Sequence, residues 1–101
     1  MYITTNGIRI SKGSSPQLVQ LFQTQEGIKK QPGFMNLEIW TQLQDDPEDF
    51  CLVVTQWKSK EHYDNWIASD AFKRSHSGTH PTYILGPGVT NHYKLGLAVS
   101  L

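Results

Sequence analysis

The chain has little of several features that define narrow classes of protein. Its 101 residues include one cysteine, Cys51, so no intrachain disulfide can form and no cysteine-rich metal cluster is available. Nine basic and nine acidic side chains cancel, which argues against nucleic acid or an anionic membrane as a partner. No stretch approaches the ~20 apolar residues that cross a bilayer, and the first ten residues lack the pattern of a secretory signal. We therefore expect a cytoplasmic protein.

The length is that of one domain, which we take to span residues 1–101. Strand signals with alternating character cover residues 2–8, where Asn6 interrupts as a polar residue, and residues 35–42. The segment FCLVVTQW, residues 50–57, is apolar on both faces and is therefore expected in the middle of a sheet. A last strand is expected over residues 89–97.

Two helical regions separate these strands. The first begins with Ser15 as the expected N-cap and Pro16 at the first helical position, and Gly27 is its expected end. Ser59 is the expected N-cap of the second. Asp70 resembles a fresh cap, so we expect this second helix to break there and to restart.

The order of elements predicts an α+β, ferredoxin-like βαββαβ domain, with an antiparallel sheet and helices on one face. The other face of the sheet then has no cover. Because Trp40, Trp57 and the apolar third strand cannot all lie beneath two helices, we expect two such sheets to meet face to face in a homodimer.

The segment WIASDAFKRSHSG holds the residues most suggestive of a ligand site. His76 follows Phe72 by four residues, so the two share one face of a helix, and Trp66 comes from the segment before the break. One neutral imidazole beside an apolar slot suits haem iron, which needs one axial ligand from the protein, and suits zinc badly. Ordinary roles compete with this interpretation: a histidine near a helix end usually caps carbonyls or faces solvent, a tryptophan is usually core, and Asn6 is usually an edge residue.

A resemblance favours the ligand site. Asn6, Trp66 and His76 match the Asn, Trp and His triad of the IsdG-type haem-degrading monooxygenases, within the antibiotic-biosynthesis-monooxygenase superfamily of dimeric α+β barrels. The likeness covers most of the chain, through NGIRISKG, KKQPGF and above all VVTQWKSKEHYDNWIASDAFKRSHSG. Gly7 is a departure, since relatives often carry a larger residue there, and it could loosen the strand around Asn6.

The resemblance implies a role for each residue. His76 becomes the proximal ligand of the haem iron, Asn6 donates a hydrogen bond on the distal side, and Trp66 presses against the porphyrin. Phe22 and Val53 are candidate apolar walls of the pocket, and ordinary core positions are an equally good interpretation of both. Weaker candidates for the propionates are Arg9, Lys73 and Arg74.

The expected function is that of a haem-degrading monooxygenase. Haem is substrate and cofactor at once, dioxygen is consumed, and iron and a linear tetrapyrrole are released. No flavin- or nicotinamide-binding fingerprint occurs in the sequence, so an external reductase or reductant must supply electrons. Two alternatives stay open: a cofactor-free monooxygenase of polycyclic phenols or quinones, and a haem-binding protein without turnover. The ligand could also be another histidine, namely His62, His80 or His92.

Overall fold

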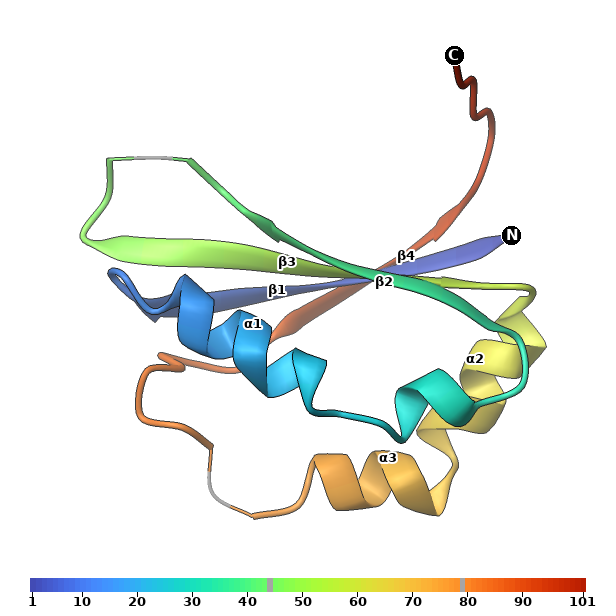
Figure 1. Ribbon diagram of the computed structural model, residues 1–101, viewed down its shortest axis with the longest axis horizontal. Coiled ribbons are helices and arrows are strands. Elements are labelled where there is room, and N and C mark those ends of the chain that lie inside the picture. Colours follow the sequence, from blue (N-terminus) through green and yellow to red (C-terminus); the bar gives the residue numbers. More distant parts are fainter. Residues whose placement is uncertain (44, 79) are drawn as a thin grey trace.

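The computed structural model describes residues 1–43, 45–78 and 80–101, and its elements follow the expected order (Figure 1). One short 3-10 turn, η1, is added between the first helix and the second strand. The elements are β1 (Tyr2–Ser11), α1 (Ser15–Gln23), η1 (Ile28–Lys30), β2 (Phe34–Thr41), β3 (Glu48–Trp57), α2 (Lys60–Ile67), α3 (Asp70–Ser75) and β4 (Val89–Lys94).

The four strands form one antiparallel sheet in the order β2-β3-β1-β4, with α1, α2 and α3 on one side of it (Figure 1). The prediction that the third strand is central is therefore confirmed. Asn6 of β1 lies opposite Val53 of β3 and Thr90 of β4. The pairing of β1 with β3 runs without a bulge from Tyr2 to Ser11, so Gly7 does not interrupt the ladder around Asn6.

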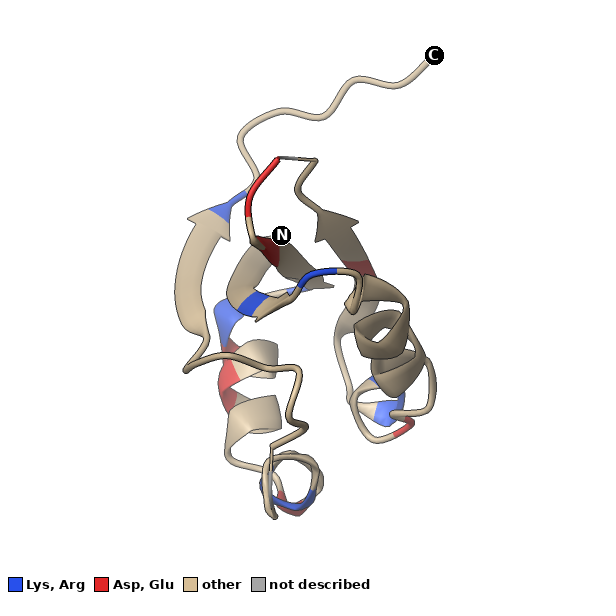
Figure 2. Ribbon diagram, turned by 90° about the vertical axis from the view of Figure 1, so that its left-hand side faces the viewer, with Lys and Arg blue, Asp and Glu red and all other residues tan. Residues whose placement is uncertain are grey.

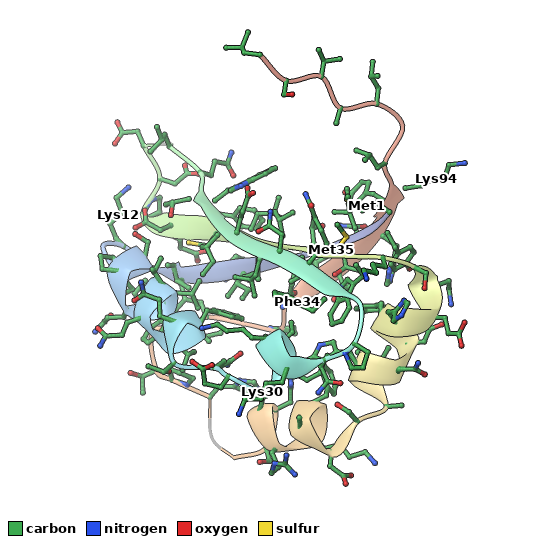
Figure 3. All side chains as sticks on the ribbon, turned by 45° about the vertical axis from the view of Figure 1, so that its right-hand side comes forward. Met1, Lys12, Lys30, Phe34, Met35 and Lys94 are labelled. Carbon is green, nitrogen blue, oxygen red and sulfur yellow. The ribbon has the colours of Figure 1, made fainter. Side chains whose placement is uncertain are left out.

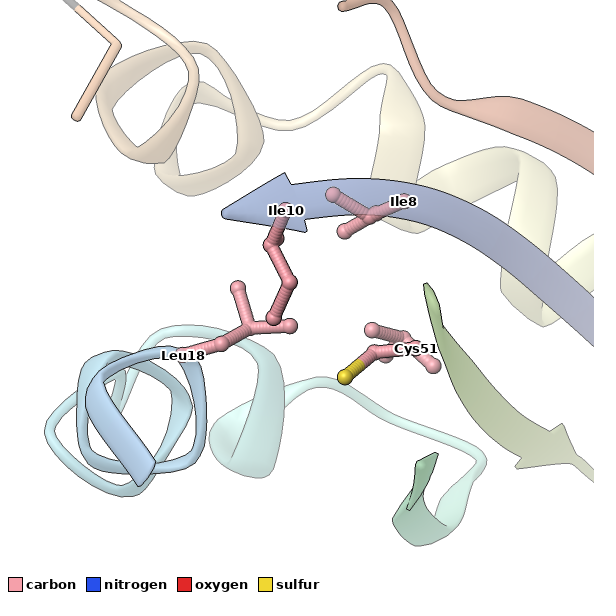
Figure 4. Close-up of a cluster of buried hydrophobic side chains, with 5 residues drawn as sticks. Ile8, Ile10, Leu18 and Cys51 are labelled. Carbon is pink, nitrogen blue, oxygen red and sulfur yellow. The ribbon is translucent and has the colours of Figure 1, made fainter. Parts of the chain in front are cut away.

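Two hydrophobic clusters fill the space between the sheet and the helices. In the first, Ile8 and Ile10 of β1 meet Leu18 of α1 together with Cys51 and Val53 of β3 (Figure 4). In the second, the buried Trp57 and Trp66 pack with Ile28 of η1 and with several half-buried aromatic rings. Alternation along the strands explains this distribution, because every second side chain of β1 and β3 points towards the helices.

The ends of α1 differ from the prediction. Its N-cap is Ser14, one residue before Ser15, and Pro16 follows in the first turn. The helix ends at Gln23 and not near Gly27, because the hydroxyl of Thr24 donates to the carbonyl of Leu21 at 2.8 Å and closes the last turn. Gly27 instead begins η1.

The second helix breaks where the sequence indicates, but another residue caps the restart. Ser59 begins α2 as predicted, accepting a hydrogen bond from the backbone N–H of His62 at 3.3 Å. Ser69, and not Asp70, begins α3: its backbone is extended, and its Oγ accepts from the N–H of Phe72 at 3.1 Å. Asp70 lies in the first helical turn, where a carboxylate favours the positive end of the helix dipole.

The last strand is shorter than predicted. β4 ends at Lys94, which pairs with Tyr2, the first residue of β1; beyond this pair the N–H of Leu95 still donates to the carbonyl of Met1. Residues 95–101 continue as an extended tail that stands clear of the domain beyond Lys94 (Figure 3).

The second face of the sheet is free of helices, as expected. Trp40 of β2 lies on this face and is 53% exposed. Of the residues that cannot all lie beneath two helices, Trp57 points to the helix side and is fully buried. Basic and acidic residues are distributed over strands, helices and loops (Figure 2). None of the helices in the described ranges is long and apolar enough to span a membrane.

Candidate functional site

His76 lies at the end of α3 as its C-cap residue and is exposed. Its ring stacks on that of Phe72, with centroids 4.0 Å apart and planes at 27°. The i, i+4 relationship predicted from the sequence is therefore confirmed as a direct contact. A histidine that merely caps a helix end or faces solvent would be exposed in the same way. Whether His76 is suited to bind a metal therefore depends on the hydrogen bonds of its ring.

The nitrogen Nδ1 of His76 lies 2.9 Å from the backbone oxygen of Phe72 and 2.9 Å from Oγ of Ser75. A carbonyl can only accept, so Nδ1 must carry the hydrogen in this arrangement. The Ser75 hydroxyl donates its hydrogen to the same Phe72 carbonyl, so the lone pairs of Ser75 Oγ are available to accept from Nδ1–H of His76. In the neutral ring Nε2 is then an unprotonated donor of a lone pair, the state that a metal ligand requires.

Trp66, on α2, is 6% exposed and is connected to His76 through Phe72. Its indole meets the Phe72 ring edge-on, with centroids 5.4 Å apart, and stacks against Trp57 on its other side at 6.5 Å. Ser69 fixes this junction, since its hydroxyl donates to the Trp66 carbonyl at 2.6 Å while accepting from the N–H of Phe72. The helix break thus places the indole and the imidazole on two sides of one phenyl ring.

Asn6 is half-buried, and the oxygen of its side-chain amide has an unusual environment. Its Oδ1 is buried and has no hydrogen-bond partner in the structure, and its Nδ2 bonds to none of the described residues. An unsatisfied buried polar atom carries a free-energy penalty of about 1–3 kcal/mol. Such an amide is expected where a ligand supplies the missing bond.

Gly88 is the residue that makes room for this amide. A side-chain carbon added at Gly88 would lie 2.3 Å from Oδ1 of Asn6 and 3.0 Å from its Nδ2. The backbone just before β4 therefore covers the Asn6 side chain closely. Sequence reasoning missed Gly88, because only the pairing of β4 with β1 brings it to Asn6.

Phe22 and Val53 belong to the first hydrophobic cluster. Val53 lies directly opposite Asn6 on β3 and is buried, and Phe22, on α1, packs half-buried against the same cluster. Both residues thus act as core in this structure. Phe22 also borders a surface hollow of about 500 Å³ between α1, η1 and β2.

Two further hollows flank α3. One, of about 540 Å³, is bordered by Trp66, Arg74 and Ser75 together with residues of the α1–β2 connection. The other, of about 890 Å³, is bordered by Phe72 on the helix side and by Tyr2, Thr90 and His92 on the sheet side. Both volumes lie in the range of small-molecule sites. The ring system of Trp66 and Phe72 therefore separates two openings in the surface.

The other histidines are held differently. Nδ1 of His62 is 2.7 Å from the Ser59 hydroxyl, and Nδ1 of His92 is 2.7 Å from the Tyr2 hydroxyl. His80 is exposed and makes no hydrogen bond among the described residues. His76 is the histidine of these four that stacks on the neighbour of Trp66.

Of the basic candidates for the propionates, Arg9 is already engaged. It makes a two-point ion pair with Glu48, at 2.9 and 3.1 Å. This pairing raises the pKa of the Arg9 guanidinium and lowers the pKa of the Glu48 carboxyl. Lys73 and Arg74 lie in the last turn of α3, next to His76.

The donor set fits haem better than a bare metal ion. Over residues 1–43, 45–78 and 80–101 no group of three or more His, Cys, Asp or Glu side chains lies close enough to hold a metal. Haem requires one imidazole from the protein, and His76 offers one with a free Nε2. The orphaned amide of Asn6 is a second polar group suited to a ligand.

The chain is similar in sequence to proteins that bear the names of heme-degrading enzymes. The chain is 35% identical over 92 residues to a heme-degrading monooxygenase from Bacillus thuringiensis, covering 89% of this chain and 86% of that protein. It is 33% identical over 79 residues to a staphylobilin-producing heme oxygenase from Staphylococcus epidermidis, covering 78% of this chain and 76% of that protein.

Solved structures show the same fold. A heme-degrader from Mycobacterium tuberculosis with two hemes bound in its active site superposes with a TM-score of 0.78 at 20% identity, over 99% of this chain and all of that one. A Bacillus cereus structure assigned to the antibiotic biosynthesis monooxygenases gives 0.84 at 21% identity, over 99% and 97% of the two chains. The family model for antibiotic biosynthesis monooxygenases matches residues 1–78. The chain belongs to the antibiotic biosynthesis monooxygenase family.

Proposed function

We propose that this protein is a haem-degrading monooxygenase that opens the porphyrin with dioxygen and external electrons. The observation that carries the proposal is the state of His76, whose Nδ1 is committed to the Phe72 carbonyl and whose Nε2 is free. Two relatives at 33–35% identity that bear the name of heme-degrading enzymes support it. Iron and a linear tetrapyrrole are the products.

His76 binds the haem iron through Nε2 in this proposal. The Phe72 carbonyl and the Ser75 hydroxyl both accept from Nδ1–H, which fixes the tautomer and the orientation of the ring. Stacking on Phe72 restricts rotation of the imidazole. The protein thereby provides a ligand whose direction is set before haem arrives.

Asn6 and Trp66 act on the substrate from other sides. The Asn6 amide has hydrogen-bonding capacity to spare, and its Nδ2 supplies a neutral donor towards the face of the haem where dioxygen reacts. Trp66, packed between Trp57 and Phe72, cannot move aside easily, so a porphyrin pressed against it must bend instead. Haem itself supplies the oxidising centre.

The active form is a homodimer in this proposal. Leu52 and Val54 of β3 on the helix-free face are apolar, and Trp40 on the same face is half exposed. A second copy placed face to face would cover them and form an α+β barrel. Electrons come from a separate reductase or a small reductant, and neither bound flavin nor nicotinamide takes part.

The test begins with haem titration of the purified protein. A Soret band that shifts on addition of one equivalent, and that decays under air with ascorbate while a linear tetrapyrrole and free iron accumulate, is the expected result. A Soret band that persists under the same conditions would instead indicate a haem-binding protein without turnover. No shift at all would favour a cofactor-free monooxygenase of polycyclic phenols or quinones.

A further inference from the structure

The aromatic residues of the second cluster form a continuous series that leads from the proposed haem site to the surface. Trp66 stacks on Trp57 at 6.5 Å, Trp57 meets Tyr63 at 6.1 Å, and Tyr63 meets Tyr2 at 5.6 Å between ring centroids. Three different elements supply these rings, since β1, β3 and α2 each contribute. Indole and phenol rings are the side chains most easily oxidised by one electron apart from cysteine, so this series consists of residues suited to one-electron transfer.

The outer end of the series has a feature that core packing does not require. The Tyr2 hydroxyl is 2.7 Å from Nδ1 of His92, and the His92 ring also contacts Tyr63 at 5.6 Å. A phenol that loses an electron becomes a strong acid and must lose its proton, so a hydrogen-bonded imidazole makes the oxidation easier. Tyr2 has this partner, whereas burial raises the pKa of Tyr63 and disfavours loss of its proton.

We propose that Trp66, Trp57, Tyr63 and Tyr2 form an electron-transfer relay that ends in the Tyr2–His92 pair and protects the haem site from its own oxidants. It rests on the proposed function for the source of the oxidant, which is partially reduced dioxygen formed at the haem. The relay itself is a property of the haem-free protein. Close ring contacts matter here because electron transfer slows steeply with distance.

The electrons and protons of one cycle balance. An oxidant at the haem takes one electron from Trp66, Trp57 replaces it, and Tyr2 then gives its electron to Trp57 across the Tyr63 ring, which bridges the two and keeps its own proton. As Tyr2 gives up its electron, its phenol proton moves to Nδ1 of His92, which requires the tautomer with hydrogen on Nε2. The external reductant already needed by the reaction then returns one electron to Tyr2, and His92 returns the proton.

The experiment uses haem-free protein, so that its outcome does not depend on haem binding. In a Trp40→Phe background, Trp57 and Trp66 are the remaining indoles. A laser flash at a wavelength that tryptophan absorbs and tyrosine does not removes an electron from these indoles, and a cobalt(III) ammine complex accepts it. The expected result is decay of the tryptophan radical with matching growth of a tyrosyl radical, at a rate independent of protein concentration.

Variants assign the end of the relay. Tyr2→Phe keeps the ring and removes the hydroxyl, and His92→Phe keeps a ring and removes the proton acceptor; each is expected to abolish the tyrosyl signal. Tyr93→Phe is the matched control, because Tyr93 is 51% exposed on β4 and has no ring contact in the described structure. A tyrosyl radical of undiminished yield in Tyr2→Phe, or none in the Trp40→Phe background, would overturn the relay. Failure of haem binding alone would overturn the proposed function and leave the relay standing.

Discussion

The imidazole of His76 and the phenyl ring of Phe72 lie face to face, 4.0 Å apart, and the same imidazole donates to the backbone carbonyl of Phe72. Phe72 thus positions His76 through both its ring and its backbone carbonyl. Since Phe72 also meets Trp66 edge-on, the proposed iron ligand and the proposed distorting wall share one support. Substitutions at His76 should therefore affect binding of the haem iron, and substitutions at Phe72 or Trp66 should affect the packing of the rings.

His76→Ala is expected to abolish the haem-induced Soret shift while leaving the fold intact, because the side chain is exposed and its loss removes little packing. Haem titration followed by absorbance, with circular dichroism for the fold, makes the measurement. His80→Ala is the matched control, since His80 is an exposed histidine of the following loop. A normal shift in His76→Ala and its loss in His62→Ala or His92→Ala would reassign the ligand.

Asn6→Leu is expected to raise the free energy of unfolding of the haem-free protein by about 1 kcal/mol, because it removes a buried oxygen that has no partner. The same change is expected to leave haem binding in place and to slow haem breakdown. Urea unfolding measures the first effect, and the decay of the Soret band under air with ascorbate measures the second. A destabilised protein with normal turnover would show that the Asn6 amide is structural.

Gly88→Ala tests the position of the same amide without changing it. The added carbon would lie 2.3 Å from Oδ1 of Asn6, so the amide must move, and slower haem breakdown with retained binding is expected. Gly96→Ala is the control, because a carbon added there meets no atom within 4 Å. Equal rates in the two variants would count against a role for the orientation of Asn6.

Leu52→Asp tests the proposed dimer. Leu52 is half-buried on the helix-free face of β3, opposite Gly7 and Trp40, and a carboxylate there could not be covered by a second sheet without a large desolvation penalty. We expect a monomer by sedimentation equilibrium. Leu97→Asp, in the exposed tail, should leave the assembly unchanged; a dimer that survives Leu52→Asp would place the interface elsewhere.

Asp49→Asn tests an acid-sensitive contact next to the first helix. The Asp49 carboxylate accepts the N–H of Gly13 at 2.8 Å and pairs with Lys12 at 3.3 Å, and the pKa of Asp49 is lowered mainly by the first of these bonds. A lowered pKa means that this stabilisation is complete above the ordinary value of about 3.9 and is lost as the pH falls from there through the folded value.

The variant should therefore flatten the fall in stability over this acid range, as measured by urea unfolding at a series of pH values. Asp46→Asn is the control, because Asp46 is exposed in the same connection and makes no hydrogen bond among the described residues. An unchanged acid slope in Asp49→Asn would show that the contact does not contribute to folding.

The sequence allowed the fold to be predicted because alternation and capping are local properties. The strand periods, the Ser59 cap and the helix break before Asp70 all lie within a few neighbouring residues. Ser69 was missed as the cap because serine and aspartate both suit that position, and only backbone geometry distinguishes them. β4 was predicted too long because its end depends on its pairing with β1, far away in the chain, and that pairing ends at Tyr2 and Lys94.

The candidate site was less predictable for the same reason. The contact of Phe72 with His76 follows from helix spacing, but the cover of Asn6 by Gly88 and the bond between Tyr2 and His92 join segments more than eighty residues apart. Trp57 could not be placed either, because the apolar third strand shows no polar side from which to tell inside from outside.

The hydroxyl of Ser69 donates to the carbonyl of Trp66 in the last turn of α2 and accepts from the N–H of Phe72 in the first turn of α3. The angle between these helices is thus governed at a single hinge that lies outside the sheet. A substitution at Ser69 would therefore change how Trp66 and Phe72 lie relative to each other without altering any residue of the strands.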